Sequence, residues 1–172
     1  MRAMLPYFSE KFGNTMSLHS FGQEAKMALE ESRQEIADLI GVKPEEIIFT
    51  SSATESNNLA LKGVGWANQQ KGKHIIISPI EHDFVLESAK WLQGQGFEIT
   101  KLLVDKYGLI NPADVEKNIR QDTILVSVIH ASNEIGTIQD IAEIGRICRE
   151  RGILFHTDAA QANGVIPIDV EK

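Results

Sequence analysis

The sequence predicts an α/β fold in which a mostly parallel β-sheet is flanked by helices. Short β-rich runs alternate along the chain with longer segments of helical periodicity, as in repeated strand–helix–strand units. The apolar run at residues 123–129 is almost continuous, which is typical of a strand buried on both faces of a sheet. A length of 172 residues suffices for a buried core, so we expect residues 1–172 to form a single domain.

Helices are expected where apolar residues recur near the 3.6-residue period. The first ends at Gly41, and the following Lys43-Pro44 step prevents immediate re-entry into a helix. Asn111 followed by Pro112 is typical of a helix start. The expected helices cover residues 24–40, 55–70, 83–93, 111–120 and 140–151. The expected strands cover residues 46–50, 74–78, 97–104, 123–129 and 153–157.

Composition and charge exclude some classes of partner. The formal net charge is -7, which argues against nucleic acid or an anionic membrane as the main partner, because both attract basic surfaces. An anionic cofactor is still compatible, since a local cluster of donors can hold a phosphate. The sole cysteine, Cys148, cannot form an internal disulfide, so we expect a cytoplasmic protein. Its helical spacing with Ile141 and Ile144 indicates a core position rather than a nucleophile.

Polar side chains follow four of the expected strands. In parallel sheets, ligands bind beyond the carboxyl ends of the strands, so these segments are the candidate site. They are Ser51-Ser-Ala-Thr-Glu-Ser, Pro79-Ile-Glu-His, His130-Ala-Ser-Asn-Glu and Asp158-Ala-Ala-Gln.

Each of these segments also has a purely structural interpretation. The hydroxyls and amides around Thr54 suit a phosphate at a helix start, although spacing alone favours simple capping. Asp158 could pair with a ring nitrogen, bind a metal or cap a helix, and Asn133 could be a turn residue. A lone histidine such as His82 is more often structural than catalytic. His156 and Asp158 share a strand face, but two ligands are too few to indicate zinc.

The segment Gly63-Val-Gly65 partly matches a dinucleotide-binding fingerprint. It falls inside an expected helix rather than directly after a strand, so we reject that interpretation.

Together these motifs resemble the cysteine desulfurases that supply sulfur for iron–sulfur clusters, within the class V aminotransferases. The resemblance extends over essentially all 172 residues. It rests on Phe12-Gly-Asn, Ser17-Leu-His-Ser-Phe-Gly, Phe49-Thr-Ser-Ser-Ala-Thr-Glu-Ser-Asn-Asn-Leu-Ala, Glu81-His, Ser127-Val-Ile-His-Ala-Ser-Asn-Glu-Ile-Gly-Thr-Ile-Gln and His156-Thr-Asp-Ala-Ala-Gln.

The resemblance implies the large domain of a fold-type I enzyme that binds pyridoxal 5'-phosphate (PLP), truncated at both ends. In the family, PLP is held on a lysine, L-cysteine displaces that lysine, and a separate cysteine thiolate takes the sulfur as a persulfide, leaving alanine. It also implies a homodimer and a scaffold protein that accepts the sulfur.

The resemblance implies roles for individual residues. Thr54, with Ala53 beside it, is expected at the cofactor phosphate. His82 is expected to stack on the pyridine ring and to act catalytically by moving protons. Asp158 is expected to pair with the protonated ring nitrogen. The remaining two, Gln161 and Asn133, are expected to hydrogen-bond near the ring hydroxyl and the substrate.

Two residues central to the family's chemistry have no counterpart in these 172 residues. The lysine motif of the family lies downstream of Asp158-Ala-Ala-Gln, and neither Lys172 nor Cys148 matches the family's lysine or persulfide cysteine. We therefore expect no desulfurase turnover from these residues alone. Two alternatives stay open: another class V enzyme, such as a selenocysteine lyase or an aminotransferase, and a non-catalytic module that binds PLP or pairs with another subunit.

Overall fold

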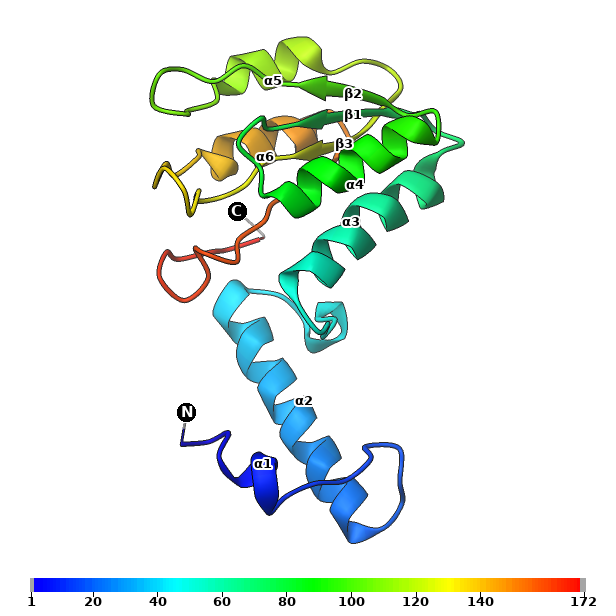
Figure 1. Ribbon diagram of the computed structural model, residues 1–172, viewed down its shortest axis with the longest axis vertical. Coiled ribbons are helices and arrows are strands. Elements are labelled where there is room, and N and C mark those ends of the chain that lie inside the picture. Colours follow the sequence, from blue (N-terminus) through cyan, green and yellow to red (C-terminus); the bar gives the residue numbers. More distant parts are fainter. Residues whose placement is uncertain (1, 171–172) are drawn as a thin grey trace. The chain divides into compact units, whose positions relative to one another are not determined.

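The computed structural model describes residues 2–170, with the elements in the order shown in Figure 1. These residues group into two compact units. One unit contains the chain up to Phe49 together with the segment from Ile168, and the other spans Thr50–Pro167. Each is described by itself, and the expectation of one domain over residues 1–172 stays a prediction.

The first unit is built on a long helix, α2 (Ser20–Ile40). It begins four residues before the expected start because the His19 side chain accepts a hydrogen bond from the Gly22 amide at 3.3 Å and caps the helix. It ends as predicted at Gly41, whose φ of 75° is the left-handed conformation that glycine adopts without strain.

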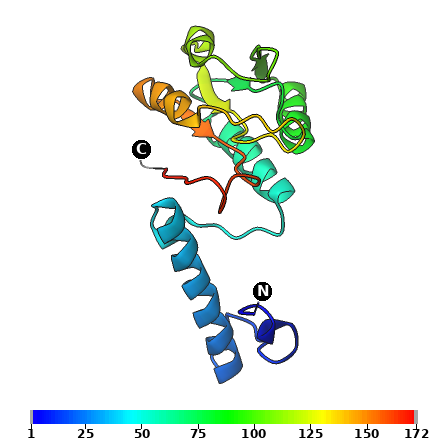
Figure 2. The ribbon, with the colours of Figure 1, turned by 90° about the vertical axis from the view of Figure 1, so that its left-hand side faces the viewer.

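A short helix, α1 (Pro6–Ser9), lies beside the beginning of α2 (Figure 2). The connection is held by a Lys11–Glu24 ion pair of 2.8 Å and by stacking of Phe12 on Phe21, whose ring centroids are 6.4 Å apart. Gly13 is required there, because a Cβ atom would lie 2.4 Å from the Phe21 carbonyl oxygen.

The strand predicted at residues 46–50 is wrong. The structure has a 3₁₀ turn, η1 (Pro44–Glu46), followed by irregular backbone. The Ile47 carbonyl accepts a hydrogen bond from the Arg33 guanidinium of α2 at 2.5 Å, and that guanidinium also lies over the Phe49 ring. The backbone of this segment is thus bound by a side chain, where a strand would need a neighbouring backbone.

The second unit contains a four-stranded sheet in the order β2-β1-β3-β4, with every neighbouring pair parallel. The strands are β1 (His74–Ile77), β2 (Glu98–Lys101), β3 (Thr123–Ser127) and β4 (Leu154–His156). All four lie inside predicted strands but are shorter, because the sequence pattern continues into the extended segments that follow each strand. The predicted parallel α/β fold is confirmed.

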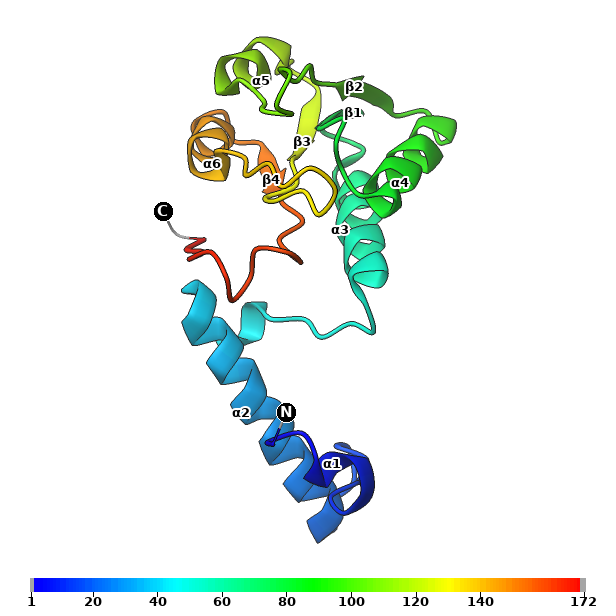
Figure 3. The ribbon, with the colours of Figure 1, turned by 60° about the vertical axis from the view of Figure 1, so that its left-hand side comes forward.

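Helices cover both faces of the sheet (Figure 3). On one face, α3 (Ala53–Asn68) and α4 (Asp83–Gly94) bury a cluster that contains Leu61, Ile75 and Leu92. On the other, α5 (Pro112–Asn118) and α6 (Ile141–Glu150) pack over a second cluster that includes Val126 and Cys148. The predicted core position of Cys148 is confirmed, and burial raises the pKa of its thiol to about 11. Among residues 2–170, no helix is both long and apolar enough to cross a membrane.

Candidate functional site

The predicted site segments meet at one edge of the sheet. Because the strands are parallel, the segments that follow β1, β3 and β4 all leave from their carboxyl ends. Helix α3 precedes β1, and its first turn lies at the same edge, since Asn57 of α3 donates a hydrogen bond to Asp158 after β4 at 2.9 Å. This bond links α3 directly to the segment after β4, and the expectation that the four segments form one site stays a prediction.

The first turn of α3 carries both a cap and free donors. Ser52 caps the helix by accepting from the Glu55 amide at 3.3 Å, as the capping interpretation predicts. The Ser51 amide and hydroxyl both donate to the Glu55 carboxylate at 2.7 Å, and these bonds lower the pKa of Glu55. The amides of Ala53 and Thr54 have no hydrogen-bond acceptor among the described residues, because the first turn of a helix lacks intrahelical partners. They are available to an anion.

Both carboxylate oxygens of Asp158 accept hydrogen bonds. One oxygen, Oδ2, accepts from Asn57, and the other, Oδ1, accepts from the Ala160 amide at 3.0 Å. Its backbone carbonyl accepts from the His130 amide at 2.9 Å, which ties it to the end of β3. A carboxylate can accept about four hydrogen bonds, so Asp158 is oriented and still has capacity for a cationic N–H donor.

His82 lies at the beginning of α4, where it caps the helix. Its Nδ1 atom accepts from the Phe84 amide at 3.5 Å, and its ring stacks on Phe84 with centroids 4.1 Å apart. His82 therefore has a structural contact at the start of α4. Its expected stacking on a pyridine ring stays a prediction.

Asn133 and Gln161 both lie exposed in turns at the same edge. The Asn133 turn is closed by Ser132, whose amide donates to Thr137 and whose carbonyl accepts from Gly136, both at 2.9 Å. Among the described residues, neither the Asn133 nor the Gln161 side chain has a hydrogen bond. Their roles toward a ligand stay predictions.

Sequence reasoning assigned no individual role to Asn57 or to Glu81, although both stand in the motifs that carry the resemblance. Asn57 is 4% exposed and Glu81 is 5% exposed. Burial raises the pKa of Glu81 to about 8, a hydrogen bond from the Ile129 amide opposes that shift, and the negative charge of Asp158 adds to it. Both are polar residues, Asn57 on an otherwise apolar helix face and Glu81 after a mostly apolar strand. Such positions could have indicated buried hydrogen-bonded groups, because buried polar groups require partners.

The His156 side chain, in β4, forms a hydrogen bond within the sheet. Its Nδ1 atom lies 2.9 Å from the Ser127 hydroxyl of the neighbouring strand. Burial lowers the pKa of His156 to about 4, and the Asp158 charge opposes that shift only in part. Within residues 2–170 no group of three or more histidine, cysteine or acidic side chains is arranged to hold a metal ion.

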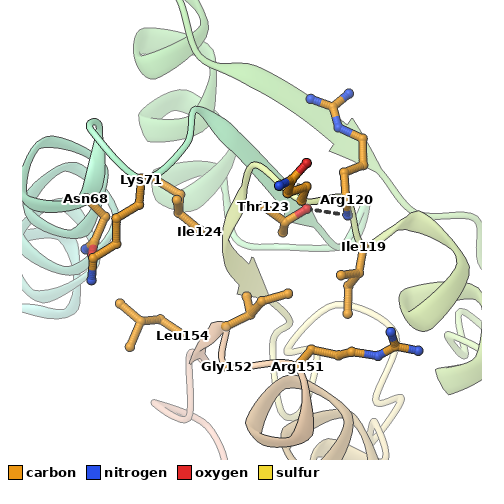
Figure 4. Close-up of a pocket in the computed structure, with 11 residues that line it drawn as sticks. Asn68, Lys71, Ile119, Arg120, Thr123, Ile124, Arg151, Gly152 and Leu154 are labelled. Carbon is orange, nitrogen blue, oxygen red and sulfur yellow. Dashed lines mark hydrogen bonds between the residues drawn. The ribbon is translucent and has the colours of Figure 1, made fainter.

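A cavity of about 590 Å³ lies at the opposite edge of the sheet, where β3 and β4 begin (Figure 4). Thr123 lines it and accepts from the Arg120 amide at 2.7 Å. Two cationic side chains that line the cavity form ion pairs: Arg120 with Glu98, and Arg151 with Glu116. Its lining residues are those at the amino ends of the strands, so this cavity is separate from the candidate site.

The comparison with known families assigns the fold. The family described as aminotransferase class-V matches residues 1–172. The chain belongs to this family. The cysteine desulfurases IscS of Methanosarcina thermophila and of Dictyoglomus turgidum are both class V relatives that are 54% identical to this chain. The alignment covers 100% of this chain and 43% of the first relative, and 99% and 43% for the second.

Similar solved structures agree with this assignment. A structure of SspA in complex with cysteine superposes with a TM-score of 0.94 at 41% identity, over 99% of this chain and 49% of that one. The apo cysteine desulfurase of Thermococcus onnurineus gives a TM-score of 0.89 at 35% identity, over 99% and 42%. The chain thus spans less than half the length of the relatives it matches. Class V aminotransferases and cysteine desulfurases use PLP, as the sequence resemblance implied.

The residues of the site fit that cofactor at both of its ends. The unpaired amides and the Thr54 hydroxyl at the start of α3 suit a phosphate, which a helix N-terminus also favours electrostatically. Asp158 offers an oriented carboxylate to a ring nitrogen that carries a proton.

Proposed function

We propose that this chain is the part of a PLP-dependent cysteine desulfurase that holds the cofactor. One observation carries the proposal: helix α3 contributes to two parts of the site at once. Its first turn contains the free amides of Ala53 and Thr54, and one turn later Asn57 binds Asp158 at 2.9 Å. A single rigid helix therefore sets the spacing between an anion-binding turn and an oriented carboxylate.

The phosphate end of PLP would lie at the first turn of α3. Two backbone amides and the hydroxyl of Thr54 are available there, and each is a hydrogen-bond donor to phosphate oxygens. Glu55 does not compete for this position, because its carboxylate is bound by the amide and hydroxyl of Ser51.

The ring end of PLP would lie at Asp158. PLP, when bound, supplies an electron-withdrawing ring to the amine of its substrate. The part of Asp158 is to hold the proton on the ring nitrogen through a charge-assisted hydrogen bond, and Asn57 and the Ala160 amide keep its two oxygens oriented. In this proposal His82 packs on the ring face and moves protons, while Asn133 and Gln161 bind the ring hydroxyl and the substrate.

L-Cysteine is the proposed substrate. Support comes from the 54% identity to cysteine desulfurases over the whole chain and from a similar fold solved in complex with cysteine. A homodimer and a protein that accepts the sulfur belong to the same proposal. Selenocysteine is the competing substrate, and it is distinguished by comparing the release of alanine from the two amino acids.

PLP binding tests the proposal directly on this chain. Equilibrium dialysis against PLP, read by the absorbance of the cofactor, should show one bound PLP per chain. Thr54→Val and Asp158→Asn should each weaken binding about 10-fold or more, because each loses a hydrogen bond to a charged group worth about 1.5–3 kcal/mol.

Matched controls replace the same residue types elsewhere. Thr15→Val and Asp38→Asn lie in the first unit, and they should leave PLP affinity unchanged. Equal PLP affinity of the wild-type chain, Thr54→Val and Asp158→Asn would overturn the proposed site.

A further inference from the structure

Glu81 is a buried carboxyl group at the edge where the strands end, and the proposed reaction does not use it. It lies four residues after the last residue of β1 and immediately precedes His82. Its Oε1 atom accepts from the Ile129 amide at the end of β3 at 2.7 Å. Its Oε2 atom is also buried and has no hydrogen-bond partner among the described residues.

An ionised carboxylate would be poorly accommodated in this position. Among residues 2–170 no lysine or arginine forms an ion pair with Glu81. The unpartnered Oε2 would then be a buried anionic oxygen with neither a donor nor a countercharge, which is among the most costly arrangements in a protein. A proton on Oε2 removes the charge and keeps the bond between Oε1 and the Ile129 amide.

Among the described residues, no ionisable group forms an ion pair with Glu81. Asp158, after β4, carries a negative charge that opposes ionisation of Glu81. Burial lowers the pKa of His130, after β3, and lowers that of His156, in β4, to about 4, so burial disfavours the charged form of both imidazoles. On its own turn, Glu81 is followed by His82 and then by the exposed Asp83.

The hydrogen bonds of Glu81 continue to Asp158 through consecutive backbone amides. The Ile129 amide donates to Glu81, and the next amide, that of His130, donates to the Asp158 carbonyl at 2.9 Å. Glu81 therefore fixes the end of β3 from one side, and Asp158 is attached to it on the other.

We propose that Glu81 is a positioning residue that acts as an uncharged acid, holding the end of β3, and through it Asp158, against the turn that carries His82. Its value to the cofactor rests on the function proposed above. With Glu81 neutral, Asp158 is the single negative charge that this cluster presents to a protonated ring nitrogen. A charged Glu81 would compete with it.

The protonation state can be measured in the 172-residue chain without PLP. Glutamate labelled with ¹³C at the side-chain carboxyl carbon is followed by NMR against pH, and the Glu81 signal is identified by its loss in Glu81→Gln. The proposal expects a midpoint near pH 8, with the Ile129 and His130 amide signals moving at the same midpoint. A midpoint near the ordinary value of 4.5 would overturn it.

Rescue by the neutral isostere is a second test. Glu81→Gln keeps an acceptor for the Ile129 amide and cannot ionise, whereas Glu81→Ala leaves that amide unpaired. Chemical unfolding should give Glu81→Gln a higher midpoint than the wild type at pH 9, and Glu81→Ala a lower midpoint than Glu81→Gln at every pH. Glu31→Gln, on the exposed surface of α2, is the matched control and should not gain stability at pH 9.

The outcomes separate this proposal from the proposed function. A midpoint near pH 8 in a chain that binds no PLP would leave the role of Glu81 intact and remove the cofactor site. If Glu81→Ala does not fold, the titration and the Glu81→Gln comparison still decide. Glu81→Gln less stable than the wild type at pH 9 would contradict an uncharged role.

Discussion

Asn57 donates a hydrogen bond to Asp158 at 2.9 Å, although the two residues are 101 positions apart in the chain. Asn57 lies one turn after the start of α3, and Asp158 follows the end of β4. The bond therefore closes the sheet edge at which the predicted site segments gather. It orients the carboxylate through an amide that cannot ionise, so the negative charge of Asp158 stays available to a ligand.

Replacing Asn57 by alanine should destabilise the chain and weaken PLP binding together. The buried amide would be lost and one oxygen of Asp158 left without its donor, which typically costs about 1–3 kcal/mol. Urea unfolding and PLP dialysis measure the two effects. Asn163→Ala, an exposed turn residue, is the control, and an effect of Asn57→Ala no larger than that of Asn163→Ala would contradict the account.

Two glycines of α3 should respond in opposite directions to alanine. Gly63 has no atom within 4 Å of the place where a Cβ would lie, so Gly63→Ala should stabilise the helix by up to about 1 kcal/mol. At Gly65 a Cβ would lie 3.0 Å from Leu92 Cδ2, and Gly65→Ala should be destabilising. Thermal unfolding measures both, and a loss of stability at both positions would show that Gly63 is also confined.

Acidification should destabilise the chain through His156. Its pKa is lowered to about 4 in the folded state, whereas an unfolded histidine titrates near 6.5, so only the unfolded state gains a proton between these values. Stability should therefore fall as the pH falls from about 6.5 to about 4, by up to about 3 kcal/mol.

His156→Gln should flatten that fall in stability. The relevant measurement is the difference between the unfolding free energies of His156→Gln and the wild type at each pH. Glu81 contributes a slope of the opposite sign, because its raised pKa makes stability fall as the pH rises from about 4.5 to about 8. This contribution is the same in both proteins, so it cancels when their unfolding free energies are subtracted. Parallel curves for the two proteins would contradict a buried neutral His156.

Cys148 should be unreactive in the folded chain. It is fully buried, and its thiol pKa is raised to about 11, so very little thiolate is present near pH 7. A chromogenic disulfide reagent that reacts with thiols should modify Cys148 many-fold more slowly in buffer than in urea. The absorbance change reports on Cys148 alone, because the chain has one cysteine. Similar rates under both conditions would show that α6 opens readily.

The sheet could be predicted from the sequence because its signals are local. The apolar run that became β3 and the Asn111-Pro112 start of α5 are both decided by neighbouring residues. Residues 46–50 have the same β-rich composition, but strand formation depends on a partner backbone. Arg33, distant in sequence, occupies the Ile47 carbonyl instead.

The site could be predicted in part for the same reason. Polar residues after the expected strands selected segments that the structure brings to one edge of the sheet, although Ser51–Ser56 follows a 3₁₀ turn and irregular backbone and not a strand. The partnership of Asn57 with Asp158 and that of Glu81 with Ile129 join segments that are 101 and 48 residues apart, and nothing in the local pattern specifies them. Both hydrogen bonds form only in the folded chain, where the sheet brings the two partners together.

The most direct test of the central claim is a chimera in which residues 1–172 replace the matching segment of the Methanosarcina thermophila relative. That relative is 54% identical over the whole of this chain, so the junctions and the core should be compatible. The chimera should release alanine from L-cysteine, and Asp158→Ala in the chimera should abolish that release. A folded chimera that binds PLP but releases no alanine, or one whose release survives Asp158→Ala, would contradict the account.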